Sequence, residues 1–112
     1  MLIMKNFTKD GYVIHLGKTA KENWKLLEGA KSHHYFFHLS SFPSGYVILE
    51  HDLEEVPENV IIECAVICKD ETKYRNLKNL KVDYCQCSNV MKGDIVGEAI
   101  FRSNRKVKVI LL

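Results

Sequence analysis

The sequence predicts an α+β domain in which an antiparallel or mixed β-sheet is combined with two α-helices, in the order β-α-β-β-α-β-β-β. Short runs of β-branched and aromatic residues are bounded by turn-forming residues, which is typical of strands. Two longer segments instead carry apolar residues at helical spacing. The 112 residues have the size of one domain, and we expect residues 1–112 to fold as a single unit.

The first strand and the first helix are predicted over residues 12–16 and 19–30. Tyr12–Leu16 is apolar and β-branched, and it lies between the turn signal Asp10-Gly11 and Gly17. Apolar residues then recur at helical spacing. Thr19 suits the N-cap, and Glu22 follows three positions later, as in a capping box.

Two strands, 35–39 and 46–49, are predicted on either side of a Ser/Pro/Gly loop, and we expect them to pair antiparallel. A second helix is predicted over residues 57–70, because Pro57 suits a first helical turn and apolar residues follow at helical spacing. Later strands are expected near residues 82–87, 100–101 and 107–111, with Arg102–Arg105 as a hairpin turn between the last two.

The charge is unevenly distributed, although the net charge is only +2. Residues 1–31 hold six lysines and three acids, residues 32–63 hold six acids and no Lys or Arg, and residues 64–112 hold ten basic residues and five acids. Basic terminal segments around an acidic middle predict a polyanion-binding face. Scattered, solvated charge is the alternative interpretation.

The sequence has no apolar stretch of the length that a bilayer span requires, and no signal-peptide core. We therefore expect a cytoplasmic protein without membrane association, in which the four cysteines are reduced thiols.

The Gly17-Lys18-Thr19 sequence invites comparison with a phosphate-binding loop. The Walker pattern requires four residues between its glycines, whereas five separate Gly11 from Gly17 and these five form a predicted strand. A nucleotide-hydrolysing loop is therefore rejected. A glycine turn that opens a helix nevertheless presents N–H groups, and Lys18 and Lys21 add positive charge, so this helix start is a candidate phosphate contact.

Five histidines and four cysteines raise the question of a metal site. Cys64 and Cys68 are one helical turn apart, and Cys85 and Cys87 share one face of a strand; neither spacing is the C-x-x-C of structural zinc sites. We predict no metal, no cofactor and no catalytic residue, and keep a small Cys/His enzyme or metal protein as an alternative. A second candidate for nucleic-acid contact is His38 with Ser44 and Tyr46, which could hydrogen-bond a phosphate or stack on a base.

Two motifs resemble the NFACT RNA-binding domain family, and the likeness continues to the end of the chain. They are Gly11-Tyr12-Val13-Ile14-His15-Leu16-Gly17-Lys18-Thr19-Ala20, with Asn23, and Phe36-Phe37-His38-Leu39 followed by Pro43-Ser44-Gly45-Tyr46-Val47-Ile48-Leu49. The sequence departs from the family pattern at Tyr46, where the family has His, and at Glu50, where it commonly has a basic residue.

In this family the domain forms the C-terminal end of large ribosome-associated quality-control factors that bind the large subunit and tRNA. The resemblance therefore implies a non-enzymatic module that binds structured RNA (tRNA or rRNA), with DNA as an open alternative. A protein-interaction adaptor that docks a basic partner on the acidic segment 50–63 is the alternative from another class. The predicted RNA-binding residues are Gly17, Lys18, Lys21, Asn23, His38, Ser44, Gly45, Tyr46, Lys73 and Arg75.

Overall fold

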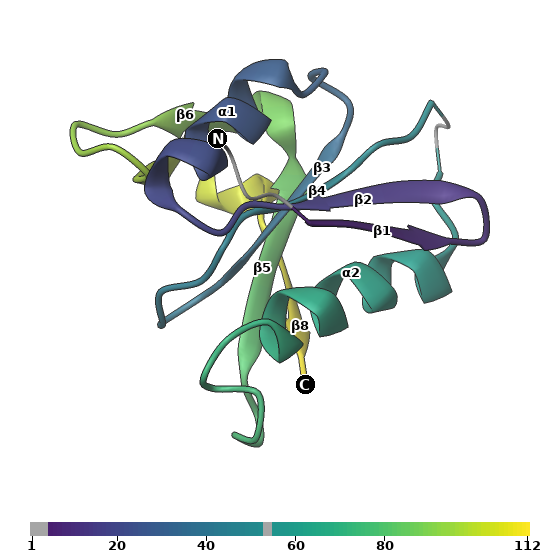
Figure 1. Cartoon of the computed structure of the whole chain (residues 1–112). Helices are drawn as coiled ribbons and strands as arrows, with labels where there is room; N and C mark the ends of the chain where they lie inside the picture. The colour runs from purple at the N-terminus through teal and green to yellow at the C-terminus, as the bar shows by residue number, and fades with distance from the viewer. Residues whose placement is uncertain (1–4, 53–54) are drawn as a thin grey trace.

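The computed structural model describes residues 5–52 and 55–112, and within these ranges it confirms the predicted α+β class. Two α-helices and eight strands follow one another along the chain (Figure 1). They are β1 (Lys5–Lys9), β2 (Tyr12–Leu16), α1 (Ala20–Gly29), β3 (Tyr35–Leu39), β4 (Val47–Leu49), α2 (Glu58–Asp70), β5 (Lys81–Gln86), β6 (Val90–Lys92), β7 (Ala99–Phe101) and β8 (Lys108–Leu111).

Six of the strands form one sheet in the order β1-β2-β4-β3-β5-β8, and β6 and β7 form a separate two-stranded ribbon. Every strand pair among the described residues is antiparallel, including the predicted pair β3 and β4. The predicted hairpin between the last two strands is wrong: β7 pairs with β6, and β8 pairs with β5. The buried Asn89 amide exchanges two 2.9 Å hydrogen bonds with the Ser103 backbone, so the chain directly after β7 is tied to the turn before β6.

Strand β1 was not predicted. It pairs with β2 through a tight turn in which Asp10 and Gly11 both have positive φ, 51° and 85°. Two consecutive residues of this kind are typical of a two-residue hairpin. The strand itself is mostly polar and exposed at the edge of the sheet, so its own residues carry little apolar signal.

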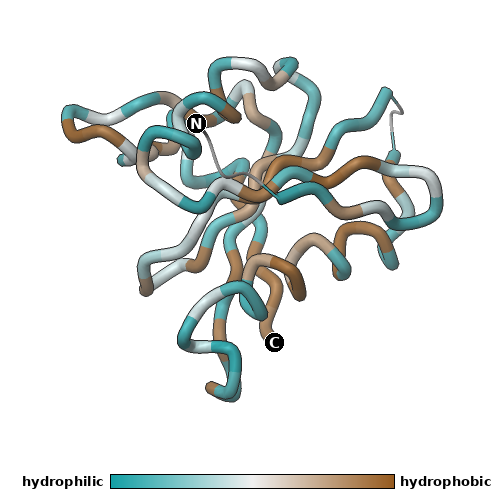
Figure 2. Tube along the Cα trace, in the orientation of Figure 1, coloured by the Kyte–Doolittle hydropathy of each residue, from teal (hydrophilic) through white to brown (hydrophobic). Residues whose placement is uncertain are grey.

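The sheet is covered on both faces. Helix α2 packs on one face, over a cluster that includes Leu16, Phe37 and Val82. Helix α1 and the β6–β7 ribbon pack on the other face, against Phe36, Tyr46 and Ile48 (Figure 1). Figure 2 shows the hydrophobic residues concentrated along the central strands and α2, with hydrophilic residues in the connection from α2 to β5.

The two cysteine pairs lie on opposite faces of this sheet. Cys64 and Cys68 belong to the α2 cluster, and Cys85 and Cys87 belong to the α1 cluster. All four thiols are free and buried. Burial raises the pKa of Cys64, and it raises the pKa of Cys68 and of Cys87 to about 12, so these thiols stay protonated near neutral pH.

Neither helix in residues 5–52 and 55–112 combines the length and the hydropathy needed to cross a bilayer.

Candidate nucleic-acid interface

The start of α1 lies directly beside the loop between β3 and β4. The Gly17 N–H donates to the Tyr46 carbonyl across 3.0 Å, and the Tyr46 N–H donates to Asn23 Oδ1 across 3.0 Å. A Cβ on Gly17 would overlap Asn23 Oδ1, and a Cβ on Gly45 would overlap the Gly17 carbonyl oxygen. Two segments far apart in the sequence therefore meet where neither glycine leaves room for a side chain.

The predicted Thr19 cap of α1 is present, and the Glu22 side chain changes the electrostatics of the helix start. Thr19 is the N-cap, and its Oγ1 accepts from the Glu22 N–H at 3.2 Å. The Glu22 carboxylate in turn accepts from the Lys18 N–H at 2.7 Å, although its side chain is almost fully buried. A carboxylate thus already occupies the positive end of the helix dipole. The helix start was expected to offer free N–H groups to a phosphate, but the N–H groups of Lys18 and Glu22 already donate to side chains.

Helix α1 and this loop form two walls of a groove of about 450 Å³, which we call the mouth groove. The end of α2 and the residues after it form the third wall, and the β6–β7 connection forms the rim. Its lining consists of Lys18, Thr19, Ala20, Asn23, Pro43, Ser44, Gly45, Glu71, Thr72, Lys73, Tyr74, Val96 and Gly97.

Two lysines converge on one acid at this groove. Lys18 Nζ and Lys5 Nζ each lie 2.9 Å from Glu71 Oε1. These two ammonium groups hold the pKa of Glu71 below its usual value, so the carboxylate stays ionised. Both contacts are charge-assisted, and lysine makes contacts of this kind to carboxylates and to phosphates alike.

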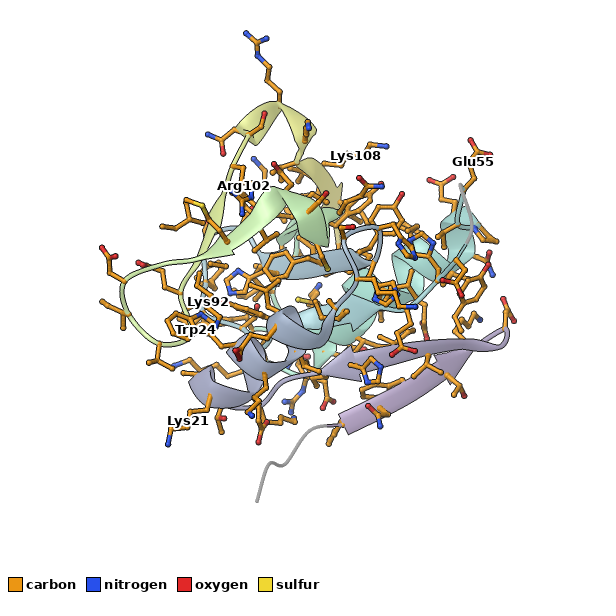
Figure 3. The ribbon with its side chains drawn as sticks, turned by 90° about the horizontal axis from the view of Figure 1, so that it is seen from above. Lys21, Trp24, Glu55, Lys92, Arg102 and Lys108 are labelled. Carbon is orange, nitrogen blue, oxygen red and sulfur yellow. The ribbon has the colours of Figure 1, made fainter. Side chains whose placement is uncertain are left out.

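The rim of the groove, the β6–β7 connection, is held by two aromatic side chains of the α1 cluster. The Tyr46 hydroxyl donates to the Gly97 carbonyl, and Trp24 Nε1–H donates to the Glu98 carbonyl at 3.0 Å. Lys92 Nζ lies 5.0 Å from the centre of the Trp24 ring, and Figure 3 shows these two residues side by side. The β6–β7 connection is therefore fixed against α1, and Val96 is left half-exposed at the groove.

Two predicted contact residues are not on an open surface. Tyr46 is 1% exposed, and burial raises the pKa of its phenol to about 12. Burial also lowers the pKa of His38, whose Nδ1–H donates to the Leu39 carbonyl at 2.7 Å, so this ring is neutral at pH 7. The predicted stacking or hydrogen-bonding of a ligand by Tyr46 is therefore wrong for this buried side chain, and His38 lies outside the groove lining.

Of the other predicted residues, some line the mouth groove and others do not. Ser44 lines the groove, but its Oγ also accepts from the Leu39 N–H at 3.1 Å and donates to the Gly45 carbonyl at 3.2 Å. Lys73 lines the groove and lies over the Tyr74 ring, 5.5 Å from its centre. Lys21, which points outwards in Figure 3, and Arg75 are exposed but do not line it.

Sequence reasoning missed Lys5, Glu71 and Tyr74. Lys5 belongs to the unpredicted strand β1, and it reaches Glu71 only because β1 folds back along β2. Tyr74 packs on Phe42 with ring centres 4.4 Å apart, and this contact places the connection after α2 against the β3–β4 loop. The basic stretch from Lys73 onward was a signal for this wall, but its aromatic partner is set by tertiary packing.

A domain of this architecture is also present in a solved structure. The C-terminal region of the fibronectin/fibrinogen-binding protein from Streptococcus suis superposes with a TM-score of 0.83 and 22% identity, covering 96% of this chain and 43% of that one. This likeness establishes the shared fold.

The family follows from the sequence comparison. The family model for the NFACT protein RNA binding domain matches residues 1–103, and the chain belongs to this family. Coiled-coil domain-containing protein 25 is similar at 28% identity over 106 residues in Bos taurus and Mus musculus, and at 24% in Danio rerio. Each match covers 88% of this chain and 51% of the relative, so the chain spans about half the length of these curated relatives.

We predict that Gly45→Ala destabilises the fold by about 1–3 kcal/mol, because the added methyl group must push the β3–β4 loop away from Gly17. Gly29→Ala is the matched control: it lies at the end of α1 with no heavy atom within 4 Å of the added Cβ, and it should stabilise by about 0.5–1 kcal/mol. Urea unfolding measures both. A Gly45→Ala variant as stable as Gly29→Ala would contradict the close approach.

Proposed function

We propose that the chain binds structured RNA, tRNA or rRNA associated with the ribosome, and that the mouth groove contacts the RNA backbone. Membership of an RNA-binding domain family supports the class of ligand. The single observation that supports the location is the convergence of Lys5 and Lys18 on Glu71, next to Lys73. The cytoplasm is the compartment that fits this ligand and the four free thiols.

In this proposal an RNA phosphate replaces the Glu71 carboxylate as the partner of the two lysines. The exchange costs little, because Lys5 and Lys18 are half to one-third exposed, and exposed ion pairs contribute only about 0–1 kcal/mol each. A phosphate offers more acceptor oxygens and releases condensed counterions when it is bound. Lys73 lies on the same wall of the groove as Glu71, and in this proposal it contacts a neighbouring phosphate of the RNA.

The proposed function is binding without catalysis. The four thiols are buried with raised pKa values, so they are poor nucleophiles. The neutral His38 ring donates its hydrogen bond to a backbone carbonyl and lies outside the groove lining. Asn23 and Ser44 bond to backbone groups and hold the walls of the groove together.

Two opposite effects on RNA affinity test the location. Lys18→Ala should weaken the binding of tRNA roughly three- to tenfold and lower the slope of log K against log[salt] by about one unit. Glu71→Gln should strengthen binding by a similar factor, because it removes the competing carboxylate while both lysines stay in place.

Fluorescence anisotropy across a salt series measures both effects. Lys31→Ala is the matched control, since it removes the same charge beyond the opposite end of α1. We expect its affinity to stay within twofold of wild type. If Glu71→Gln weakened binding, or if Lys31→Ala lost as much affinity as Lys18→Ala, the groove would not be the RNA site.

One observation favours the adaptor as a second candidate function. A groove of about 640 Å³ at the start of α2 combines apolar side chains such as Val56 and Ile62 with the carboxylates of Glu55 and Glu58. It lies in the acidic segment 50–63, of which residues 53 and 54 are outside the described residues. Lys108 also lines this groove, but the two carboxylates among apolar side chains suit a basic segment of another protein.

Affinity purification with and without nuclease separates the two functions. If the RNA proposal holds, nuclease treatment removes the co-purified ribosomal material. Partners that survive nuclease, but are lost when Glu55 and Glu58 are both changed to Gln, would establish the adaptor in its place.

A further inference from the structure

Three histidines and one aspartate gather at the end of the sheet that lies away from the mouth groove. His33 and His34 precede β3, and His51 and Asp52 follow β4. Because Tyr35 pairs with Leu49 in the antiparallel register, the residues before Tyr35 face those after Leu49. Local chain direction alone therefore brings these four side chains together, and we call them the histidine cluster.

The geometry within the cluster is close. The His33 ring centre lies 5.0 Å from that of His34 and 5.5 Å from that of His51, and the latter two are 6.2 Å apart. His33 Nε2 lies 3.2 Å from Asp52 Oδ1. One ligand-type atom from each of His33, His34 and Asp52 lies within 4.8 Å of the other two.

We propose that the histidine cluster binds a divalent transition-metal ion of the zinc type, through His33, His34 and Asp52. Imidazole nitrogen and carboxylate oxygen are ligands that Zn²⁺ takes at about 2.0–2.2 Å. Tetrahedral coordination at these lengths separates ligand atoms by about 3.3 Å. His33 Nε2 and Asp52 Oδ1 already have this separation, so only wider pairs must close, by about 1.5 Å at most. The Asp52 side chain is 86% exposed and free to make this movement. Three protein ligands leave the fourth position for water or for His51.

His34 is almost fully buried beside His33 and His51, so its ring is held in place before an ion binds. A groove of about 420 Å³, lined in part by His34, His51 and Asp52, gives an ion access from solvent.

The tautomer of His34 changes when the ion binds. The Lys31 N–H donates to His34 Nδ1 across 3.2 Å, which places the ring proton on Nε2. If Nε2 coordinates the ion, its proton moves to Nδ1 and the long contact with Lys31 is given up. The Lys31 amide thereby reports on coordination at a residue that is not itself a ligand.

Calorimetric titration of the tag-free chain with ZnCl₂ tests the proposal. We expect one ion per chain with a dissociation constant below about 100 μM, and at least about tenfold weaker binding for His33→Ala and for Asp52→Asn. Both side chains are partly or largely exposed, so the two variants should keep the fold. His15→Gln is the matched control, because His15 also pairs with a carboxylate, Glu50, but lies outside the cluster.

A parallel titration followed by ¹H–¹⁵N NMR should shift the Lys31 amide resonance in step with the calorimetric curve. The proposal is overturned if wild type binds no more tightly than His33→Ala and Asp52→Asn. It is equally overturned if His15→Gln loses as much affinity as they do, or if the Lys31 amide stays unchanged at saturation. None of these outcomes depends on whether the chain binds RNA.

Discussion

The contact between Gly17 and Gly45 is the constraint on which the rest of the proposed site depends. Asn23 holds this contact by accepting from the Tyr46 N–H, while the Gly17 N–H donates to the Tyr46 carbonyl. A side chain on either glycine would separate the start of α1 from the β3–β4 loop. The two walls of the mouth groove would then no longer lie next to each other. Gly17, Asn23 and Gly45 thus act by positioning the backbone, and the groove is a consequence of that positioning.

The electrostatics of the groove are balanced rather than strongly positive. The buried Glu22 occupies the end of the helix dipole, and Glu71 takes the two lysine ammonium groups. In free protein this balance satisfies the cations without burying unpaired charge. A polyanion that brings more oxygens can displace Glu71, whose side chain is 23% exposed, far more readily than Glu22, which is hydrogen-bonded within the helix start. In the proposed mode of binding, Glu71 therefore sets how much of the lysine charge an RNA phosphate meets.

Local sequence signals predicted most elements, because alternation, capping and turn residues act over a few positions. Tyr35–Leu39 and the Thr19 cap are as predicted. The pairing of β8 with β5 was missed, because it joins residues 24 to 30 positions apart in the sequence, beyond the reach of local signals. Among the predicted site residues, Lys18, Asn23, Ser44, Gly45 and Lys73 line the groove, whereas Tyr46 is buried. A motif shows that a residue type is required at a position. It does not show whether that residue contacts a ligand or holds the backbone in place.

Amide chemical-shift mapping of the ¹⁵N-labelled chain with tRNA tests the central claim most directly, because it requires no substitution. If the helix start and the β3–β4 loop form one RNA-binding groove, the largest shifts at low salt fall together on Lys18, Ser44, Gly45, Thr72 and Lys73. These shifts should disappear together as the salt concentration rises. Shifts confined to the acidic segment at the start of α2, with the groove amides unchanged at saturating tRNA, would contradict the account.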